Sequence, residues 1–221
     1  MVLRGLESVA VGVALCCGWG TVRAARAQMV SVPVLQNAFL NPGVTLGANF
    51  ASAKQETVYG GAVAWAPARS IVQLSAGLAL FNPDTGSSRA TWGARAMVPI
   101  PKVGTRSIGV AAFAGVGGVS VGGATETWIP VGATVGYRRA LGERRAISLY
   151  VAPFLNWARL KQDTVSAGTG FFRVSVGLDV VIVPQLGLTV GYEGGGRAST
   201  GEPGPAGGLF GVGLSYALRR Q

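Results

Sequence analysis

Residues 171–193 read FFRVSVGLDVVIVPQLGLTVGYE, and this stretch decides the fold. Every second residue from Phe172 to Ile182 is large and apolar, whereas the positions between them carry mostly small or charged side chains, namely Arg173, Ser175, Gly177 and Asp179. A period of two is the spacing of a β-strand with one apolar face. Pro184 and Gln185 interrupt the alternation, which then resumes at Leu186. The stretch therefore predicts an antiparallel hairpin centred on Pro184.

The same alternation recurs through the rest of the chain after residue 42. Segments of about ten residues, separated by turn residues, repeat the pattern. We expect ten strands with apolar faces spanning residues 44–50, 59–65, 72–80, 92–98, 108–116, 129–137, 147–157, 172–182, 186–192 and 210–218. Eight strands is the alternative count. The fold class is all-β.

The residues between the large apolar ones, which we call the second parity, indicate whether water or lipid surrounds this sheet. Only 13% of the residues are charged, against roughly 25% in soluble domains, and the second parity is mostly Gly, Ala, Ser and Thr. The lysines Lys54, Lys102 and Lys161 are expected in connections. No run approaches the ~20 apolar residues of a membrane helix. The pattern favours a transmembrane β-barrel with a lipid-facing outside, and a soluble secreted barrel that binds an apolar ligand is the alternative.

Bilayer physics requires such a sheet to close, because an open edge would leave backbone groups unpaired in hydrocarbon. The last strand should therefore pair with the first. We expect short turns after the even strands and longer loops after most odd ones, notably 158–170 and 194–208, which places both termini in the periplasm. Pro130 and Pro153 each remove one donor from a predicted strand, so we expect bulges or strand ends there.

A processing signal is expected ahead of the barrel. Arg4 precedes an apolar run from Val9 to Trp19, and Ala25-Arg26-Ala27 supplies a small-x-small cleavage site. The predicted organisation is therefore a signal peptide over 1–27, a short periplasmic segment over 28–42 and the barrel over 43–221. Both cysteines, Cys16 and Cys17, lie inside the leader, so the mature chain is expected to have no disulfide and no thiolate chemistry.

From residue 43 onward the chain resembles the superfamily of small bacterial outer-membrane β-barrel proteins. The resemblance rests on the leader, the alternation and a closing strand with Phe210, Val212, Leu214 and Tyr216. It implies outer-membrane lipid as surroundings and the barrel assembly machinery as a partner during biogenesis. In that family the closing strand usually ends in an aromatic residue. Here Leu218 takes that place and three further residues follow, which weakens the assembly signal.

Enzymatic members of that superfamily use a histidine as general acid or base, and this chain contains none. A site without histidine would need a carboxylate pair or an activated lysine. The candidates Asp179 and Glu193 take the lumen parity, but we expect them at different heights. The favoured interpretation is a lumen charge network made of Arg89, Arg95, Arg173, Asp179 and Glu193, because buried charges need partners. If the hairpin centres on Pro184, then Ser175 faces Glu193 and Arg173 lies within diagonal reach.

The function expected from the sequence is non-enzymatic, with a role in envelope structure, surface contact or limited passage of small solutes. No cofactor and no metal is expected. The net charge of +10 is scattered rather than clustered, so nucleic acid is not an expected partner, and we expect a monomer. Inward bulky residues are expected to obstruct the lumen, namely Phe113, Tyr150, Phe154 and Phe171.

We predict that the leader is removed between Ala27 and Gln28, the best small-x-small site after the apolar run. Mass spectrometry of the membrane fraction should find a chain that starts at Gln28 and lacks both cysteines. A mature chain that retains a modified Cys17 as its first residue would show a lipoprotein instead.

Overall fold

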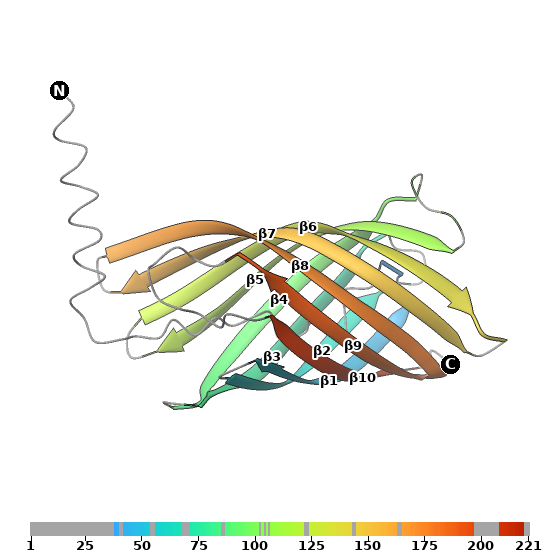
Figure 1. The fold of residues 1–221 in the computed structure, drawn as a ribbon, viewed down its shortest axis with the longest axis horizontal. Helices are drawn as coiled ribbons and strands as arrows, with labels where there is room; N and C mark the ends of the chain where they lie inside the picture. Colours follow the sequence, from blue (N-terminus) through green and yellow to red (C-terminus); the bar gives the residue numbers. More distant parts are fainter. Residues whose placement is uncertain are drawn as a thin grey trace, which may run out of the picture.

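The computed structural model describes residues 38–39, 42–53, 56–67, 71–84, 87–101, 103, 105, 107–121, 124–142, 145–162, 165–196 and 208–218. The predicted leader, its cleavage site and both cysteines lie outside these residues. Figure 1 shows a ring of strands that run obliquely around a common axis. No helix in the described part of the chain is long and apolar enough to cross a bilayer.

Ten antiparallel strands form one closed barrel, which confirms the predicted fold class and strand count. Their bounds are β1 Gly43–Ala53, β2 Glu56–Ala66, β3 Gln73–Pro83, β4 Arg89–Pro99, β5 Ile108–Val121, β6 Ala124–Ala140, β7 Ala146–Gln162, β8 Val165–Val183, β9 Leu186–Gly195 and β10 Leu209–Leu218. Each strand pairs with its sequence neighbours, and β1 pairs with β10 from Val44↔Leu218 to Ser52↔Phe210. We call the end where β1 begins and β10 ends the terminal end, and the opposite end the hairpin end.

The outer surface of the barrel is an apolar belt. The parity predicted as apolar points outward along the strands, and many of its large side chains are 40–69% exposed. Exposed aromatic side chains border the belt on both sides. Near the hairpin end they are Phe50, Tyr59, Trp92, Trp157, Phe172, Tyr192 and Phe210, and near the terminal end they are Trp65, Tyr137 and Tyr216. An apolar band between two aromatic girdles matches the profile of a bilayer.

Strand length, rather than loop length, distinguishes the two ends of the barrel. The prediction of longer loops after most odd strands is wrong, because the connections after β1, β5 and β7 are shorter than those after β2 and β4. The expected long loop over 158–170 is replaced by strand, since β7 continues to Gln162 and β8 starts at Val165. Strands β5–β8 have 14, 17, 17 and 19 residues, against 10 or 11 in the other six. Backbone pairing continues between Ala158↔Thr169 and Gln162↔Val165, so these residues extend the sheet. Lys161 therefore lies within β7 and not in a connection.

The two strand prolines interrupt single ladders without a bulge, contrary to the prediction. The β5–β6 pairing skips the positions around Pro130 and resumes in the same register, and the β6–β7 pairing does the same around Pro153. The register shift recorded in the described pairs lies between Val181 and Val183, beside the β8–β9 turn. The missing backbone N–H donor is tolerated because each proline still pairs with its other neighbouring strand. The interrupted ladder resumes within two residues.

Glycines on the inner face make room for large neighbours. A Cβ added at Gly132 of β6 would collide with the Phe154 Cβ and the Pro153 carbonyl oxygen of β7. In the same way, Gly177 of β8 leaves the space that the Tyr150 ring fills. The two glycines thus leave room for the Tyr150 ring and for the close approach of Phe154 to β6.

We predict that Gly132→Val destabilises the barrel by about 1–3 kcal/mol, because backbone as well as side chain must move. Gly61→Val, on the outward face of β2, is the control without a clash, since a Cβ there would lie 3.6 Å from the Gly47 carbonyl oxygen. Urea titrations followed by heat-modifiable gel migration measure both. Equal midpoints for the two variants would contradict the packing argument.

Candidate functional site in the barrel lumen

The lumen at the hairpin end is filled by apolar side chains. Phe81 of β3, Trp128 of β6 and Leu209 of β10 are 3–8% exposed and form one cluster. Smaller members from neighbouring strands complete it, namely Ala51, Val58, Ala79, Val119 and Ala158, and Phe171 packs against it. This cluster spans strands on all sides of the ring, so it occupies the lumen rather than one wall.

A second apolar cluster occupies the lumen toward the terminal end. Its members are Ala38, Met97, Ala111, Phe113, Ala152 and Phe154. Arg95 lies against this cluster, with its guanidinium carbon 4.0 Å from the centre of the Phe113 ring and its Nη2 3.9 Å from the Met97 sulfur. The side chain is 5% exposed, and its Nε has no hydrogen-bond partner among the described residues. A cation–π contact is thus the main feature that holds this buried charge.

The predicted ion pair between β8 and β9 is present. Ser175 pairs with Glu193 across the hairpin, as expected from a turn at Pro184, and this register brings Arg173 diagonally next to Glu193. The Arg173 Nε donates to the Glu193 Oε1 at 2.5 Å, and the Glu193 side chain is 4% exposed. Glu193 also lies close enough to Arg95 to interact with it electrostatically. Three of the five predicted network residues therefore meet in the middle of the lumen.

The two remaining residues of the predicted network lie elsewhere. Asp179 sits four positions nearer the terminal end of β8 than Ser175, and its Oδ1 accepts a hydrogen bond from the Thr189 hydroxyl at 2.5 Å. Arg89 lies at the hairpin end of β4, half-buried at an inward position. The sequence argument placed Asp179 and Glu193 at different heights, and the strand register agrees.

One buried polar pair was missed by the sequence argument. The Trp128 indole Nε1 donates to the Glu126 Oε1 at 2.9 Å, and the two residues are 3% and 9% exposed. Both lie on the inward parity of β6, upstream of the segment predicted as the sixth strand. Extending the alternation of residues 129–137 backward by two periods would have found them.

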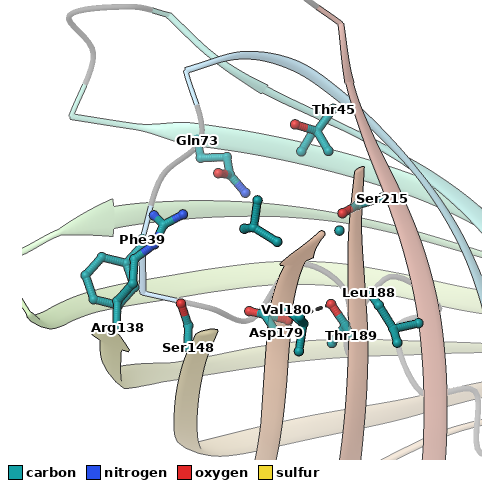
Figure 2. A pocket seen from close by; sticks show the side chains of 13 residues that line it. Phe39, Thr45, Gln73, Arg138, Ser148, Asp179, Val180, Leu188, Thr189 and Ser215 are labelled. Atoms are coloured by element: carbon teal, nitrogen blue, oxygen red, sulfur yellow. Dashed lines mark hydrogen bonds between the residues drawn. The ribbon is translucent and has the colours of Figure 1, made fainter. Parts of the chain in front are cut away.

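A polar cavity of about 60 Å³ opens at the terminal end. Figure 2 shows its lining, in which Gln73, Ser148, Thr189 and Ser215 come from different strands. Phe39, from the segment ahead of β1, lies beside the Arg138 guanidinium, whose carbon is 5.5 Å from the ring centre.

The same segment is seated on Gly109 at the start of β5. A Cβ at Gly109 would lie 3.1 Å from the Phe39 ring and 3.2 Å from the Ala38 Cβ. Ala38 is 4% exposed. Of the predicted segment 28–42, the described residues Ala38 and Phe39 therefore lie in the mouth of the barrel.

These groups offer little chemistry. No group of three or more His, Cys, Asp or Glu side chains among the described residues could hold a metal ion. The carboxylate of Asp179 accepts a hydrogen bond from a hydroxyl and that of Glu193 from a guanidinium, and no hydrogen bond joins these two described side chains directly. The arrangement is that of a structural polar network.

We predict that Glu193→Ala costs about 1.5–3 kcal/mol of stability, since it leaves Arg173 without its buried acceptor. Arg173→Ala should cost a similar amount, and the double variant should cost less than the sum, as a double-mutant cycle from urea titrations would show. The exposed Arg159→Ala serves as the control and should change stability by less than about 0.5 kcal/mol. Additive losses would mean that the two side chains do not interact.

Comparisons with known proteins bear on the fold. No family model and no curated protein sequence matches the chain. Among solved structures, the β domain of the Bordetella autotransporter BrkA has a TM-score of 0.51 and 15% identity, over 80% of this chain and 100% of that one. The KdgM porin in complex with disordered oligogalacturonate has a TM-score of 0.44 and 9% identity, over 79% and 99%. The N-terminal barrel of Pseudomonas aeruginosa OprF has a TM-score of 0.36 and 11% identity, over 79% and 96%. The chain therefore shares the β-barrel fold of the BrkA β domain.

Proposed function

We propose that the mature chain is a non-enzymatic outer-membrane barrel that contributes to envelope structure and surface contact and passes small solutes slowly at most. The observation that carries this proposal is the filling of the lumen at three levels. An apolar cluster around Phe81 and Trp128 lies nearest the hairpin end, the layer of Arg95, Phe113 and Phe154 follows, and Phe39 lies in the terminal mouth.

The outer surface supports the membrane location. Side chains such as Leu78 and Leu149 are 69% and 57% exposed, and burying such a belt in hydrocarbon removes the cost of hydrating it. The belt also argues against the alternative of a soluble carrier, because a carrier needs its apolar surface inside. We propose outer-membrane lipid as the surroundings and the barrel assembly machinery as the partner during insertion.

The filling of the lumen supports the proposal that ions pass slowly at most. An ion that crosses the barrel must pass two apolar clusters, whose side chains leave little room for its hydration shell. Barrels of about eight strands are filled by side chains, whereas open aqueous channels belong to those of about sixteen or more, so ten strands fit the filled class.

The part of the barrel wall that extends beyond the apolar belt supports the proposed role in surface contact. Strands β5–β8 overrun the hairpin-end girdle, and the orange start of β8 reaches far to the left in Figure 1. If the termini face the periplasm, this extended wall stands outside the cell. Paired strands there present a fixed surface at a lower entropic cost than long loops.

We predict that the purified protein in a planar bilayer shows at most small and infrequent conductance steps. Any steps should prefer anions, because Arg95 faces the narrow part of the lumen beside Phe113, whereas Arg173 is paired with Glu193. Arg95→Gln with Arg173→Gln should weaken that preference. Large steady steps would disprove the closed lumen. A protein that stays soluble without detergent would instead favour the soluble carrier.

A further inference from the structure

The outward face of the described barrel wall carries charges of one sign only, whereas the lumen face carries both signs. Every carboxylate that the structure describes within a strand lies at a lumen-facing position, namely Glu56, Glu126, Asp179 and Glu193. The outward positions of the described strands carry cations only, namely Arg139, Arg159 and Lys161. Each of these cations lies beyond an exposed aromatic residue, Tyr137 for the first and Trp157 for the other two. They therefore stand at the two edges of the apolar belt.

The edge of the belt is sharp across β6, β7 and β8. The last large outward side chains there are Ile129, Trp157 and Phe172. One step further toward the hairpin end, Arg159 lies between Thr127 and Gly168, and two residues later Lys161 lies between Thr125 and Ser166. The outward surface thus changes from apolar to hydroxyl-bearing and cationic within one residue pair on each strand.

The two cations on β7 are exposed and share one face. Outward positions two residues apart on a strand are about 6.6 Å apart, so both side chains can reach one ligand. A Cβ at Gly168 would have only the Ala158 carbonyl oxygen near it, at 3.5 Å, so the flank of Arg159 is open. Below it, the Trp157 indole covers Gly170, with its Nε1 3.2 Å from the place of a Cβ. We call Trp157, Arg159, Lys161, Thr125, Thr127 and Ser166 the basic patch.

We propose that the basic patch binds the phosphate groups of anionic lipid headgroups in the leaflet around the hairpin end. The proposal rests on the membrane location given above. A side chain just beyond an aromatic girdle lies at headgroup depth, where phosphate is the main anion. Guanidinium and ammonium groups donate charge-assisted hydrogen bonds to phosphate, and the neighbouring hydroxyls can add further donors. The outward face of the described strands offers no carboxylate to compete for these cations.

The terminal end provides an internal control. Arg139 is the outward cation there, and Arg145 lies in the β6–β7 connection; both are exposed. Neutralising this pair removes the same net charge as neutralising Arg159 and Lys161. Its members also lie near each other, but Arg139 faces Ile147 rather than a hydroxyl-bearing residue such as Thr127 or Thr125. The comparison therefore separates the effect of the hydroxyl-flanked patch from the effect of net charge.

The test uses the protein purified in a zwitterionic detergent and mixed with equal amounts of short-chain phosphatidylglycerol and phosphatidylcholine. Native mass spectrometry counts the lipids that stay bound. The unchanged protein should retain phosphatidylglycerol preferentially. Arg159→Gln with Lys161→Gln should lower its affinity for phosphatidylglycerol by about tenfold or more, at about 1 kcal/mol for each cation. Arg139→Gln with Arg145→Gln should lower it by less than about threefold.

Three results would overturn the proposal. One is an unchanged lipid preference in the Arg159 and Lys161 variant, and another is an equal loss in the control pair, which would indicate a net-charge effect. The third is displacement of phosphatidylglycerol by inorganic phosphate at equal concentration, which would indicate a site for small anions. Heat-modifiable migration verifies that each variant is folded, and Arg159→Lys with Lys161→Arg should keep the preference. If the variants contradict the lipid preference while the protein still inserts into bilayers, only the basic patch is disproved. A protein that does not insert would contradict both the patch and the proposed membrane function.

Discussion

Closure of the sheet is the constraint on which the rest of the structure depends. In hydrocarbon an unpaired backbone N–H or C=O costs several kcal/mol, so β1 must find β10 and every strand must keep two neighbours. A ring with an even number of strands returns the chain to the end where it started. The register of each pairing then sets which parity of a strand faces outward. Parity then decides which side chains meet lipid and which meet one another in the lumen. The belt, the girdles and the buried ion pair all follow from this single requirement.

The sequence predicted those features that depend on period and parity alone. The alternation of residues 171–193 placed the turn at Pro184, and the two-residue repeat then fixed Ser175 opposite Glu193 and Arg173 beside it. The inward positions of Phe113, Tyr150 and Phe154 followed in the same way. These predictions succeeded because a one-residue slip would exchange the lipid face and the lumen face, so the register is energetically well determined.

Features beyond the belt could not be predicted by the same means. Residues 158–170 contain small and charged residues that are typical of a loop, yet they pair because the strands below hold them in register. This explains why Lys161 was assigned to a connection and why Glu126 and Trp128 were not recognised as lumen residues. The position of Ala38 and Phe39 depends on distant partners such as Gly109 and Arg138, and no periodic pattern precedes β1 to reveal it.

The seating of Ala38 and Phe39 has a mechanical consequence. They precede β1 by a few residues, but they contact Gly109 at the start of β5 and Arg138 near the end of β6. These two strands lie about halfway around the ring from β1. A barrel wall is one layer thick, and lateral pressure from the bilayer can flatten such a ring with little loss of hydrogen bonding. A segment that is tied to β1 and packed against the opposite wall acts as a diametric brace. By spanning the mouth beside the cavity lined by Gln73, Ser148 and Thr189, it resists a change of the cross-section from round to oval.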